Sequence, residues 1–295
     1  MKMSKLSKAM LIATAAISAP AFAVPITTDI ISVVDESGSM RDEHTWLGGM
    51  ITTLDSELAA VAGTDAFSAQ YGLVGFGARS PHYTGHAHDM DAGTAGIQEF
   101  GSAAQYATAT GSLVLSGGTE DGYSGIDTAL NYTGQANSVT NIILVTDEDR
   151  DVVNGGLNYN NIKSALNGKN ALLNAVLSVG VKCGDGSTAL GMDSSGTGYK
   201  ADGAGSFTTC SGAYNSYGSS SWNDYGTLAL ATGGAVWDLN QLRAGGLTAD
   251  SFTAAFVDIK VQETIQQSTV PEPASIALLG LGLAGFGARR KFAKK

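Results

Sequence analysis

Val33-Val34-Asp35-Glu36-Ser37-Gly38-Ser39-Met40 is the stretch of sequence that decides how the rest of this chain folds. An apolar run over residues 30–34 ends at Asp35, and small hydroxyl residues follow at once. Further on, apolar residues recur three or four positions apart, which predicts a helix with one buried face. These residues are Leu47, Met50, Ile51, Leu54, Leu58 and Val61. A buried strand followed by such a helix predicts an α/β fold, with a doubly wound, mostly parallel sheet flanked by helices.

The end of this first strand is a candidate ligand site. Open α/β sheets bind ligands at the carboxyl ends of their strands, where Asp35 is expected to lie. Ser37 and Ser39 are two residues apart in a turn, so both hydroxyls can face the same point as Asp35. One carboxylate and two hydroxyls are hard oxygen donors, which suit Mg²⁺ better than zinc. A plain helix start with a serine or aspartate cap is the alternative interpretation.

The pattern Asp35-x-Ser37-x-Ser39 after an apolar strand resembles the metal-ion-dependent adhesion site of von Willebrand factor A domains. Two later segments extend the resemblance. Gly117-Gly118-Thr119 is similar to the family loop whose threonine contributes to the metal site, and the apolar run 141–145 leads to Asp147. The resemblance therefore implies a metal site with five protein ligands, Asp35, Ser37, Ser39, Thr119 and Asp147.

In this family the ion is usually Mg²⁺, and Ca²⁺ or Mn²⁺ stay open for this chain. One coordination position is left for an acidic group of a partner. The resemblance implies an exported adhesion or binding protein that is not an enzyme. Family members usually read Thr-Asp-Gly where this chain has Thr146-Asp147-Glu148, and we expect the charged residues 148–151 to be solvated rather than to tune the ion.

The resemblance covers residues 27–265 and predicts the remaining elements. Strands are expected at 70–77, at 172–181 and, at the edge of the sheet, at 235–238, and helices at 123–132 and around 252–259. Residues 182–224 are rich in Gly, Ser and Tyr and depart from the family as a long insertion. Three aspartates in Gly-rich surroundings hint at a calcium site there, although they lack the spacing of an EF-hand or of a calcium-binding nonapeptide repeat. They are Asp185, Asp193 and Asp202.

The chain begins with the three parts of a secretory signal. Lys2, Lys5 and Lys8 precede an apolar run over 9–17, and Ala21-Phe22-Ala23 forms a cleavage site before Val24. A membrane anchor is the alternative, but this run is too short to span a bilayer. We therefore expect residues 1–23 to be a signal peptide and residues 24–269 to form the exported domain.

The C-terminal segment, 270–295, resembles the PEP-CTERM sorting signal of Gram-negative bacteria. Pro271-Glu272-Pro273 precedes the uncharged residues 274–288 and a basic tip at 289–295. Fifteen residues rise roughly 22 Å as a helix, less than the roughly 30 Å of a bilayer core. The resemblance implies a transient inner-membrane contact, cleavage by an exosortase, and release to the cell surface or extracellular matrix, often beside exopolysaccharide. A plain tail anchor is the alternative.

Charge and cysteine content agree with an exported protein. Eight of the 17 basic residues but only one of the 27 acidic residues lie in the two terminal segments. The domain between them therefore carries a net charge of about −17, which argues against nucleic acid as a partner. Cys183 and Cys210 are the only two cysteines and are expected to form one disulfide.

Two further hypotheses compete with adhesion. His82, His86 and His88 lie near Asp89 and Asp91 and could hold zinc, which keeps a secreted metal-dependent hydrolase open. Their spacing matches no zinc motif, and no hydrolase or phosphate-loop motif is present, so we expect a solvated polar loop. The other hypothesis is a structural matrix protein in which the metal only stiffens the loops.

Overall fold

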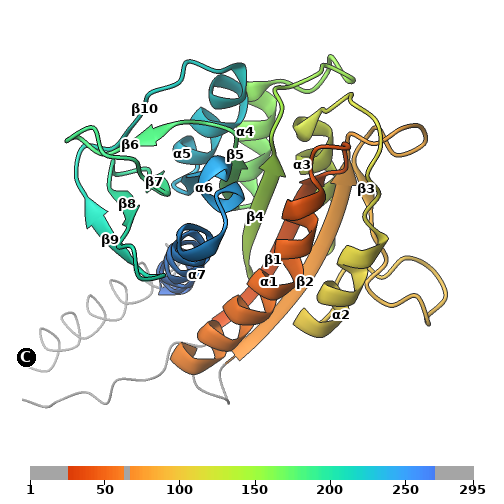
Figure 1. The fold of residues 1–295 in the computed structure, drawn as a ribbon. Helices are drawn as coiled ribbons and strands as arrows, with labels where there is room; N and C mark the ends of the chain where they lie inside the picture. The colour runs from red at the N-terminus through yellow and green to blue at the C-terminus, as the bar shows by residue number, and fades with distance from the viewer. Residues whose placement is uncertain (1–25, 63–66, 270–295) are drawn as a thin grey trace, which may run out of the picture.

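The computed structural model describes residues 26–62 and 67–269 (Figure 1). The expected signal peptide at 1–23 and sorting signal at 270–295 lie outside these residues. Within the described ranges, no helix has the length and apolar character needed to cross a membrane.

Strands and helices alternate along the chain, as the sequence pattern predicts. The strands are β1 (Ile26–Asp35), β2 (Phe67–Phe76), β3 (His86–Ala87), β4 (Val139–Thr146), β5 (Leu172–Leu177), β6 (Val181–Lys182), β7 (Gly191–Asp193), β8 (Gly198–Ala201), β9 (Phe207–Cys210), β10 (Tyr214–Asn215) and β11 (Ala235–Asp238). The α-helices are α1 (Arg41–Ala62), α2 (Ala103–Ala109), α3 (Gly122–Leu130), α4 (Tyr159–Gly168), α5 (Thr227–Ala231), α6 (Leu239–Arg243) and α7 (Gly246–Thr269). Two short helices, η1 (Thr110–Ser112) and η2 (Trp222–Gly226), precede a loop and α5, respectively.

Nine strands form one sheet in the order β3-β2-β1-β4-β5-β11-β7-β8-β9. The strands from β2 to β11 in this order are parallel to one another, whereas β3 and β7 to β9 pair antiparallel with their neighbours. This mixed, mostly parallel sheet with helices on both faces confirms the predicted fold class. The strand next to β1 on one side is β2 and on the other side β4, so β1 lies inside the sheet.

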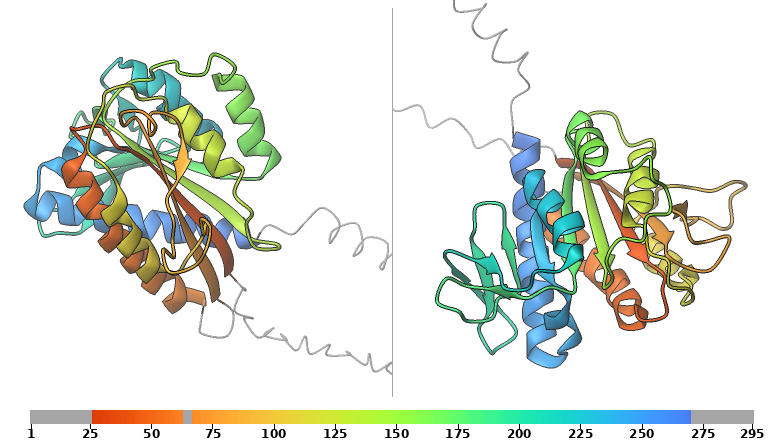
Figure 2. Two further views of the ribbon diagram at one scale, coloured as in Figure 1. Left: turned by 90° about the vertical axis from the view of Figure 1, so that its right-hand side faces the viewer. Right: turned by 90° about the horizontal axis from the view of Figure 1, so that it is seen from above.

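Side chains alternate along β1 between two hydrophobic cores. Ile30 and Val34 pack with α1, α2 and α7 on one face, and Ile31 and Val33 pack with α3, α4 and α5 on the other. Figure 2, seen from above, shows the sheet between these two helix layers. β1 is apolar on both faces, and its one charged residue besides Asp29 is Asp35, the last residue of the strand.

Two expectations about the second half of the chain need correction. Residues 235–238 form a strand, but β11 is not at the edge of the sheet, because β7 pairs with it on the far side. The segment 182–224 is not one long loop either, since β7, β8 and β9 extend the sheet as an antiparallel meander (Figure 1). These strands are only three or four residues long, too short to show an alternation of apolar and polar residues.

The predicted disulfide is confirmed. Cys183 is bonded to Cys210 and the chain between them contains β7, β8 and most of β9. The aspartates that hinted at calcium each accept backbone N–H groups of their own turns instead: Asp185 from Ser187, Asp193 from Ser195 and Thr197, and Asp202 from Ala204 and Ser206. Their local role is to close tight turns.

Two glycines in helices predict opposite effects of the same substitution. A Cβ on Gly125 in α3 would overlap the Val33 side chain of β1 and approach Phe76 to 3.1 Å. Gly125→Ala is therefore expected to destabilise the fold by about 1–3 kcal/mol in urea unfolding, although alanine favours helices.

The matched control is Gly49→Ala in α1. Nothing lies within 4 Å of a Cβ on the exposed Gly49, so this change is expected to stabilise the fold by about 0.5–1 kcal/mol. Equal effects of the two substitutions would contradict the close packing of α3 on β1.

Candidate metal centre

The two aspartates that end apolar strands lie at one edge of the sheet. β1 and β4 are parallel neighbours in which Val34 is opposite Val145, so the chain leaves both strands at the same level. The Thr146 hydroxyl donates a 2.8 Å hydrogen bond to Asp35 Oδ2 across this boundary. Asp147 follows Thr146 directly, and its carboxylate is therefore placed beside that of Asp35.

The two serines join these aspartates into one hydrogen-bonded group. The backbone N–H of Ser37 donates to Asp35 Oδ1 over 2.7 Å, and the Ser37 and Ser39 hydroxyls are 3.1 Å apart. The Ser39 hydroxyl donates to Asp147 Oδ1 over 3.0 Å. The structure thus brings together four of the five residues named from the sequence.

Thr119, the fifth residue, is exposed, and its loop approaches the group through the neighbouring Glu120. Gly117 has a left-handed φ of 103°, and a Cβ there would lie 2.6 Å from the Gly77 carbonyl oxygen. The loop can press against residues 77–79 only because this position is glycine. A Cβ on Gly77 would in turn lie 2.9 Å from Asp35 Oδ1 and 3.1 Å from Glu120 Cγ, so these two acidic side chains flank the same small space.

Burial and neighbouring negative charges raise the pKa values of two carboxyl groups in this region. Burial raises the pKa of Asp35 to about 6, against the lowering effect of the Ser37 and Thr146 hydrogen bonds, and the charge of Asp147 adds to the rise. Burial, followed by the charges of Asp35, Glu148 and Asp151, raises the pKa of Glu120 to about 7. A divalent cation at this edge would offset the repulsion, and carboxylate and hydroxyl oxygens are the ligands that Mg²⁺, Mn²⁺ and Ca²⁺ accept.

Arg243 of α6 binds the Asp147 carboxylate oxygen that Ser39 leaves free. Its guanidinium donates to Asp147 Oδ2 over 2.9 Å, to Glu43 Oε1 over 2.5 Å and to the Ser39 carbonyl oxygen over 3.2 Å. Asp147 Oδ1 remains directed to the Ser39 hydroxyl. No local sequence pattern points to Arg243, because 96 positions separate it from Asp147.

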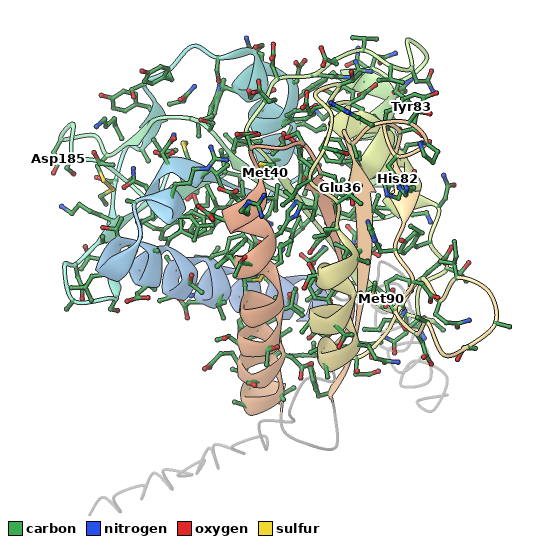
Figure 3. All side chains as sticks on the ribbon, turned by 45° about the vertical axis from the view of Figure 1, so that its right-hand side comes forward. Glu36, Met40, His82, Tyr83, Met90 and Asp185 are labelled. Carbon is green, nitrogen blue, oxygen red and sulfur yellow. A yellow bond between two sulfur atoms is a disulfide. The ribbon has the colours of Figure 1, made fainter. Side chains whose placement is uncertain are left out.

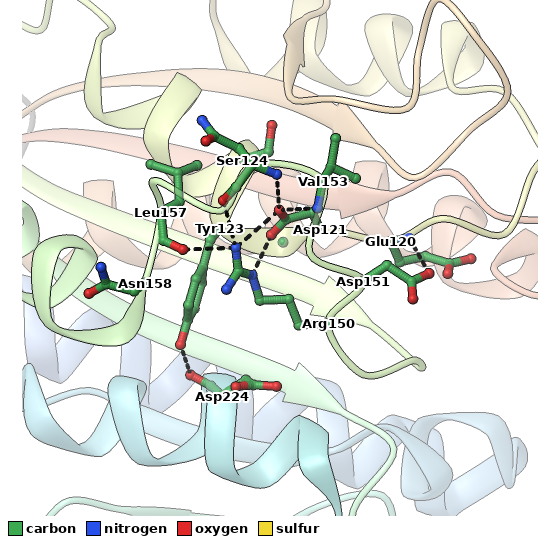
Figure 4. Close-up of polar contacts among 12 residues, drawn as sticks. Glu120, Asp121, Tyr123, Ser124, Arg150, Asp151, Val153, Leu157, Asn158 and Asp224 are labelled. Carbon is green, nitrogen blue, oxygen red and sulfur yellow. Dashed lines mark hydrogen bonds and ion pairs between the residues drawn. The ribbon is translucent and has the colours of Figure 1, made fainter.

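A buried ion pair fixes the two loops that carry Thr119 and Asp147 (Figure 4). Arg150 donates to both carboxylate oxygens of Asp121, through Nε over 2.7 Å and through Nη2 over 3.2 Å. The guanidinium also lies over the Tyr123 ring, 4.4 Å from its centre. The Asp121 side chain is fully buried, and the Arg150 side chain is only 8% exposed.

The expectation that residues 148–151 are simply solvated is therefore wrong for Arg150. Asp151 is exposed, yet its backbone N–H donates to the Glu120 carbonyl over 2.7 Å, and its carboxylate accepts the Glu120 N–H over 3.2 Å. Glu148 and Asp149 are exposed, as expected. The loop after β4 is thus bound to the loop before α3, although the family glycine is missing.

The histidine loop is also not solvated. His88 is 7% exposed, and both His86 and His88 approach the buried carboxylate of Glu36, the residue after Asp35. Burial alone would raise the pKa of Glu36, but its contacts with His86, His88 and the Val114 N–H outweigh burial and lower it to about 2. The sequence did not single out Glu36, since it lies between two residues of the oxygen site and matches no motif.

Comparison with known proteins covers both the sorting signal and the fold. Residues 269–291 match the family model described as the PEP-CTERM protein-sorting motif. The chain carries a PEP-CTERM signal. This match confirms the signal predicted from 270–295, and the motif implies export with processing by an exosortase. Among curated proteins, no sequence matches the chain.

Solved von Willebrand factor A structures are similar to this chain at low identity. A von Willebrand factor type A protein from Catenulispora acidiphila is 18% identical, with a TM-score of 0.34 over 52% of this chain and 33% of that one. Proximal thread matrix protein 1 from the mussel byssus, with a zinc-occupied MIDAS motif, is 17% identical, with a TM-score of 0.36 over 53% and 37%. The domain of the type V pili tip protein Mfa5 from Porphyromonas gingivalis is 18% identical, with a TM-score of 0.32 over 43% and 40%. The chain thus spans less than half the length of each of these structures.

Replacing Arg150, the positive partner of the buried Asp121–Arg150 ion pair, is expected to destabilise the fold. Arg150→Met leaves the Asp121 carboxylate buried without its partner, so the free energy of unfolding should fall by about 3–5 kcal/mol in urea denaturation. The double variant Asp121→Asn/Arg150→Met should lose less than the single variant, because no uncompensated charge remains.

Arg79→Met is the control, since Arg79 is exposed and the change should stay within about 0.5 kcal/mol. If Arg150→Met and Arg79→Met had the same small effect, the ion pair would not be what anchors the two loops.

Proposed function

We propose that this chain is an exported surface protein that binds an acidic group of its partner through a divalent cation. The cation, Mg²⁺ in the first place, would be held by Asp35, Ser37, Ser39, Thr119 and Asp147. The observation that carries the proposal is the hydrogen-bonded chain from Asp35 through the two serines to Asp147, which gathers oxygen donors from two separate loops at one sheet edge.

Charge balance explains why such a site would attract an acidic partner. The carboxylates of Asp35 and Asp147 together neutralise a divalent ion, and the serine and threonine hydroxyls add no charge. Arg243 compensates part of the charge on Asp147, so the ion stays electrophilic toward an incoming carboxylate. Without the ion, an acidic ligand would meet several carboxylates and be repelled.

The position of the site supports binding rather than a purely internal role. Ser39 and Thr119 are exposed, whereas Asp35 is fully buried beneath them. An ion above Asp35 would therefore have protein oxygens on its inner side and access to solvent on its outer side. The partner class we propose is a protein or an exopolysaccharide-associated molecule that bears carboxylates, met after export through the PEP-CTERM route.

A structural matrix protein is the second candidate, because the loops around the site are tied together without an ion. Arg150 and Arg243 each link loops that are distant in sequence. In that case metal would raise the melting temperature but no partner would be captured. The same binding experiment separates the two functions.

Asp147→Asn is expected to weaken Mg²⁺ or Mn²⁺ binding by about tenfold or more in calorimetric titration, because it removes one of the two charges that face the ion. The variant should also abolish Mg²⁺-dependent retention of the chain on immobilised outer-surface material of the producing cells. Chelator should release the unaltered chain from that material.

Asp149→Asn is the matched control. Asp149 is two residues away and exposed, and it accepts a hydrogen bond from Ser220 rather than from a site residue. It should keep both metal affinity and retention. Retention that persists in chelator, or in the Asp147→Asn variant, would rule out a metal-dependent adhesion mechanism.

A further inference from the structure

A second group of side chains, Glu36, His86 and His88, converges beside the oxygen site. Glu36 Oε2 lies 3.1 Å from His86 Nε2, and Glu36 Oε1 lies 3.2 Å from His88 Nε2. One donor atom from each of the three residues lies within 4.8 Å of the other two. Figure 3 labels Glu36 and the adjoining His82 at the same edge of the sheet, near β3.

The hydrogen bonds around His88 determine which of its ring nitrogens carries the proton. The Ser112 hydroxyl donates its single hydrogen to the Ala109 carbonyl over 2.6 Å. It can therefore only accept from His88 Nδ1, which lies 2.7 Å away. With the proton on Nδ1, the Nε2 atom of neutral His88 presents a lone pair toward Glu36.

His86 is oriented in the same way. Its Nδ1 lies 3.0 Å from the Thr84 carbonyl oxygen, which only accepts, so Nδ1 must donate. The unprotonated Nε2 atom of neutral His86 then lies 3.1 Å from Glu36 Oε2, without forming a hydrogen bond to it. Its other close neighbour is His82 Nδ1 at 2.9 Å, on the more exposed side of the cluster.

The facing atoms are buried and incompletely paired. The Glu36 side chain has no exposed surface and that of His88 is 8% exposed. Despite the short distances, Glu36 Oε2 and His88 Nε2 have no partner with hydrogen-bond geometry among the described residues. When both histidines are neutral, these buried acceptors face one another without a donor, which destabilises the folded state. A cation between them would remove this repulsion.

Gly75 of β2 leaves the space that such a cation would need. In the sheet Gly75 is paired with His86 of β3. A Cβ at this position would lie 2.5 Å from Glu36 Oε2 and 2.7 Å from His88 Nε2, in the middle of the cluster. Any other residue here would fill the gap between the three side chains.

We propose that Glu36, His86 and His88 bind a zinc ion, at a site separate from the oxygen site of Asp35 and Asp147. Two imidazole nitrogens and one carboxylate are a donor set that suits zinc and not Mg²⁺. Ligands at about 2.0–2.1 Å in a tetrahedron are about 3.3 Å apart, close to the two N···O distances observed. The hydrogen bonds from Nδ1 to Ser112 and Thr84 are the outer contacts that zinc-bound histidines usually make.

A zinc ion here would connect three parts of the chain. Glu36 follows the last residue of β1, His86 belongs to the two-residue edge strand β3, and the Val114 N–H donates to Glu36 Oε1 over 2.9 Å. The Ser116 N–H donates to the Glu36 carbonyl, also over 2.9 Å. The site would thus stabilise β3 and the loop that leads to Thr119, and this role does not depend on the proposed adhesion function.

Calorimetric titration of the full-length chain with Zn²⁺, in excess Mg²⁺, tests the proposal. We expect one zinc per chain and an increase in melting temperature. Glu36→Gln and His86→Gln each remove a ligand and should weaken zinc binding by at least about 100-fold. Ser112→Ala leaves the ligands intact but removes the acceptor that orients His88, and it should weaken binding by about tenfold.

Two controls separate this site from the rest of the molecule. His44 is the fourth histidine of the chain, and its ring contacts the Asp35 carbonyl rather than any of the three proposed ligands. His44→Gln should therefore leave zinc affinity unchanged. Ser39→Ala alters the oxygen site and should also leave it unchanged. Absence of zinc binding by the unaltered chain, unchanged affinity in both Glu36→Gln and His86→Gln, or loss of zinc in Ser39→Ala would each overturn the proposal. If the ligand variants do not fold, the zinc titration of the unaltered chain still tests the proposal.

Discussion

Parallel pairing between β1 and β4 is the constraint on which the candidate site depends. The two strands are in register from Thr28 and Val139 to Val34 and Val145, so both carboxyl ends stop at one level of the sheet. The Thr146–Asp35 hydrogen bond then joins the strand ends directly. A shift of one residue in this register would turn every side chain of β4 to the other face and remove Asp147 from the serines. The oxygen donors meet only because the buried cores on both faces hold this register.

At this edge of the sheet, two arginines, the nearly buried Arg150 and the more exposed Arg243, lie among many carboxylates. Arg150 compensates Asp121, and Arg243 compensates Glu43 and part of Asp147. Asp35 and Glu120 have no such partner in the part of the chain that the structure describes, and burial raises their pKa values above the ordinary range. The arginines therefore organise the loops, while the charge that stays uncompensated lies where an ion would sit. An acidic chain can maintain this arrangement because each arginine is shared by several acceptors.

Asp35, the last residue of β1, and the following Glu36 belong to two different sets of candidate metal ligands. Asp35 faces the hydroxyls of the next turn and of β4, whereas Glu36 faces the imidazoles near β3. Oxygen donors and imidazole donors prefer different ions, so the two sets need not compete although they share one stretch of backbone. The turn at 36–40 thus contacts Asp147 and Arg243 on one side, and His86 of β3 and the Val114 N–H on the other.

Local sequence determined the longer strands and helices, the first half of the candidate site and the C-terminal sorting signal. Apolar runs and three-to-four spacing predicted β1, α1 and β4 because each buries a continuous face of its own. The turn after Asp35 could be recognised because its candidate ligands are two residues apart, and the sorting signal could be recognised because its three parts are consecutive. The single pair of cysteines in an exported chain likewise left one disulfide to form.

Only the tertiary structure decided which distant side chains complete each site. Arg243 contacts Glu43, 200 positions away in the sequence, and His86 contacts Glu36, 50 positions away. Hydrophobic periodicity within one element cannot predict such contacts. The short strands β7 to β9 could not be recognised because three or four residues are too few to show alternation. Their place in the sheet comes from the pairing of β7 with β11. Periodicity reports which face of an element is buried, but not which element covers it. The partners of Glu36, Asp121 and Asp147 were set by the order of strands in the sheet.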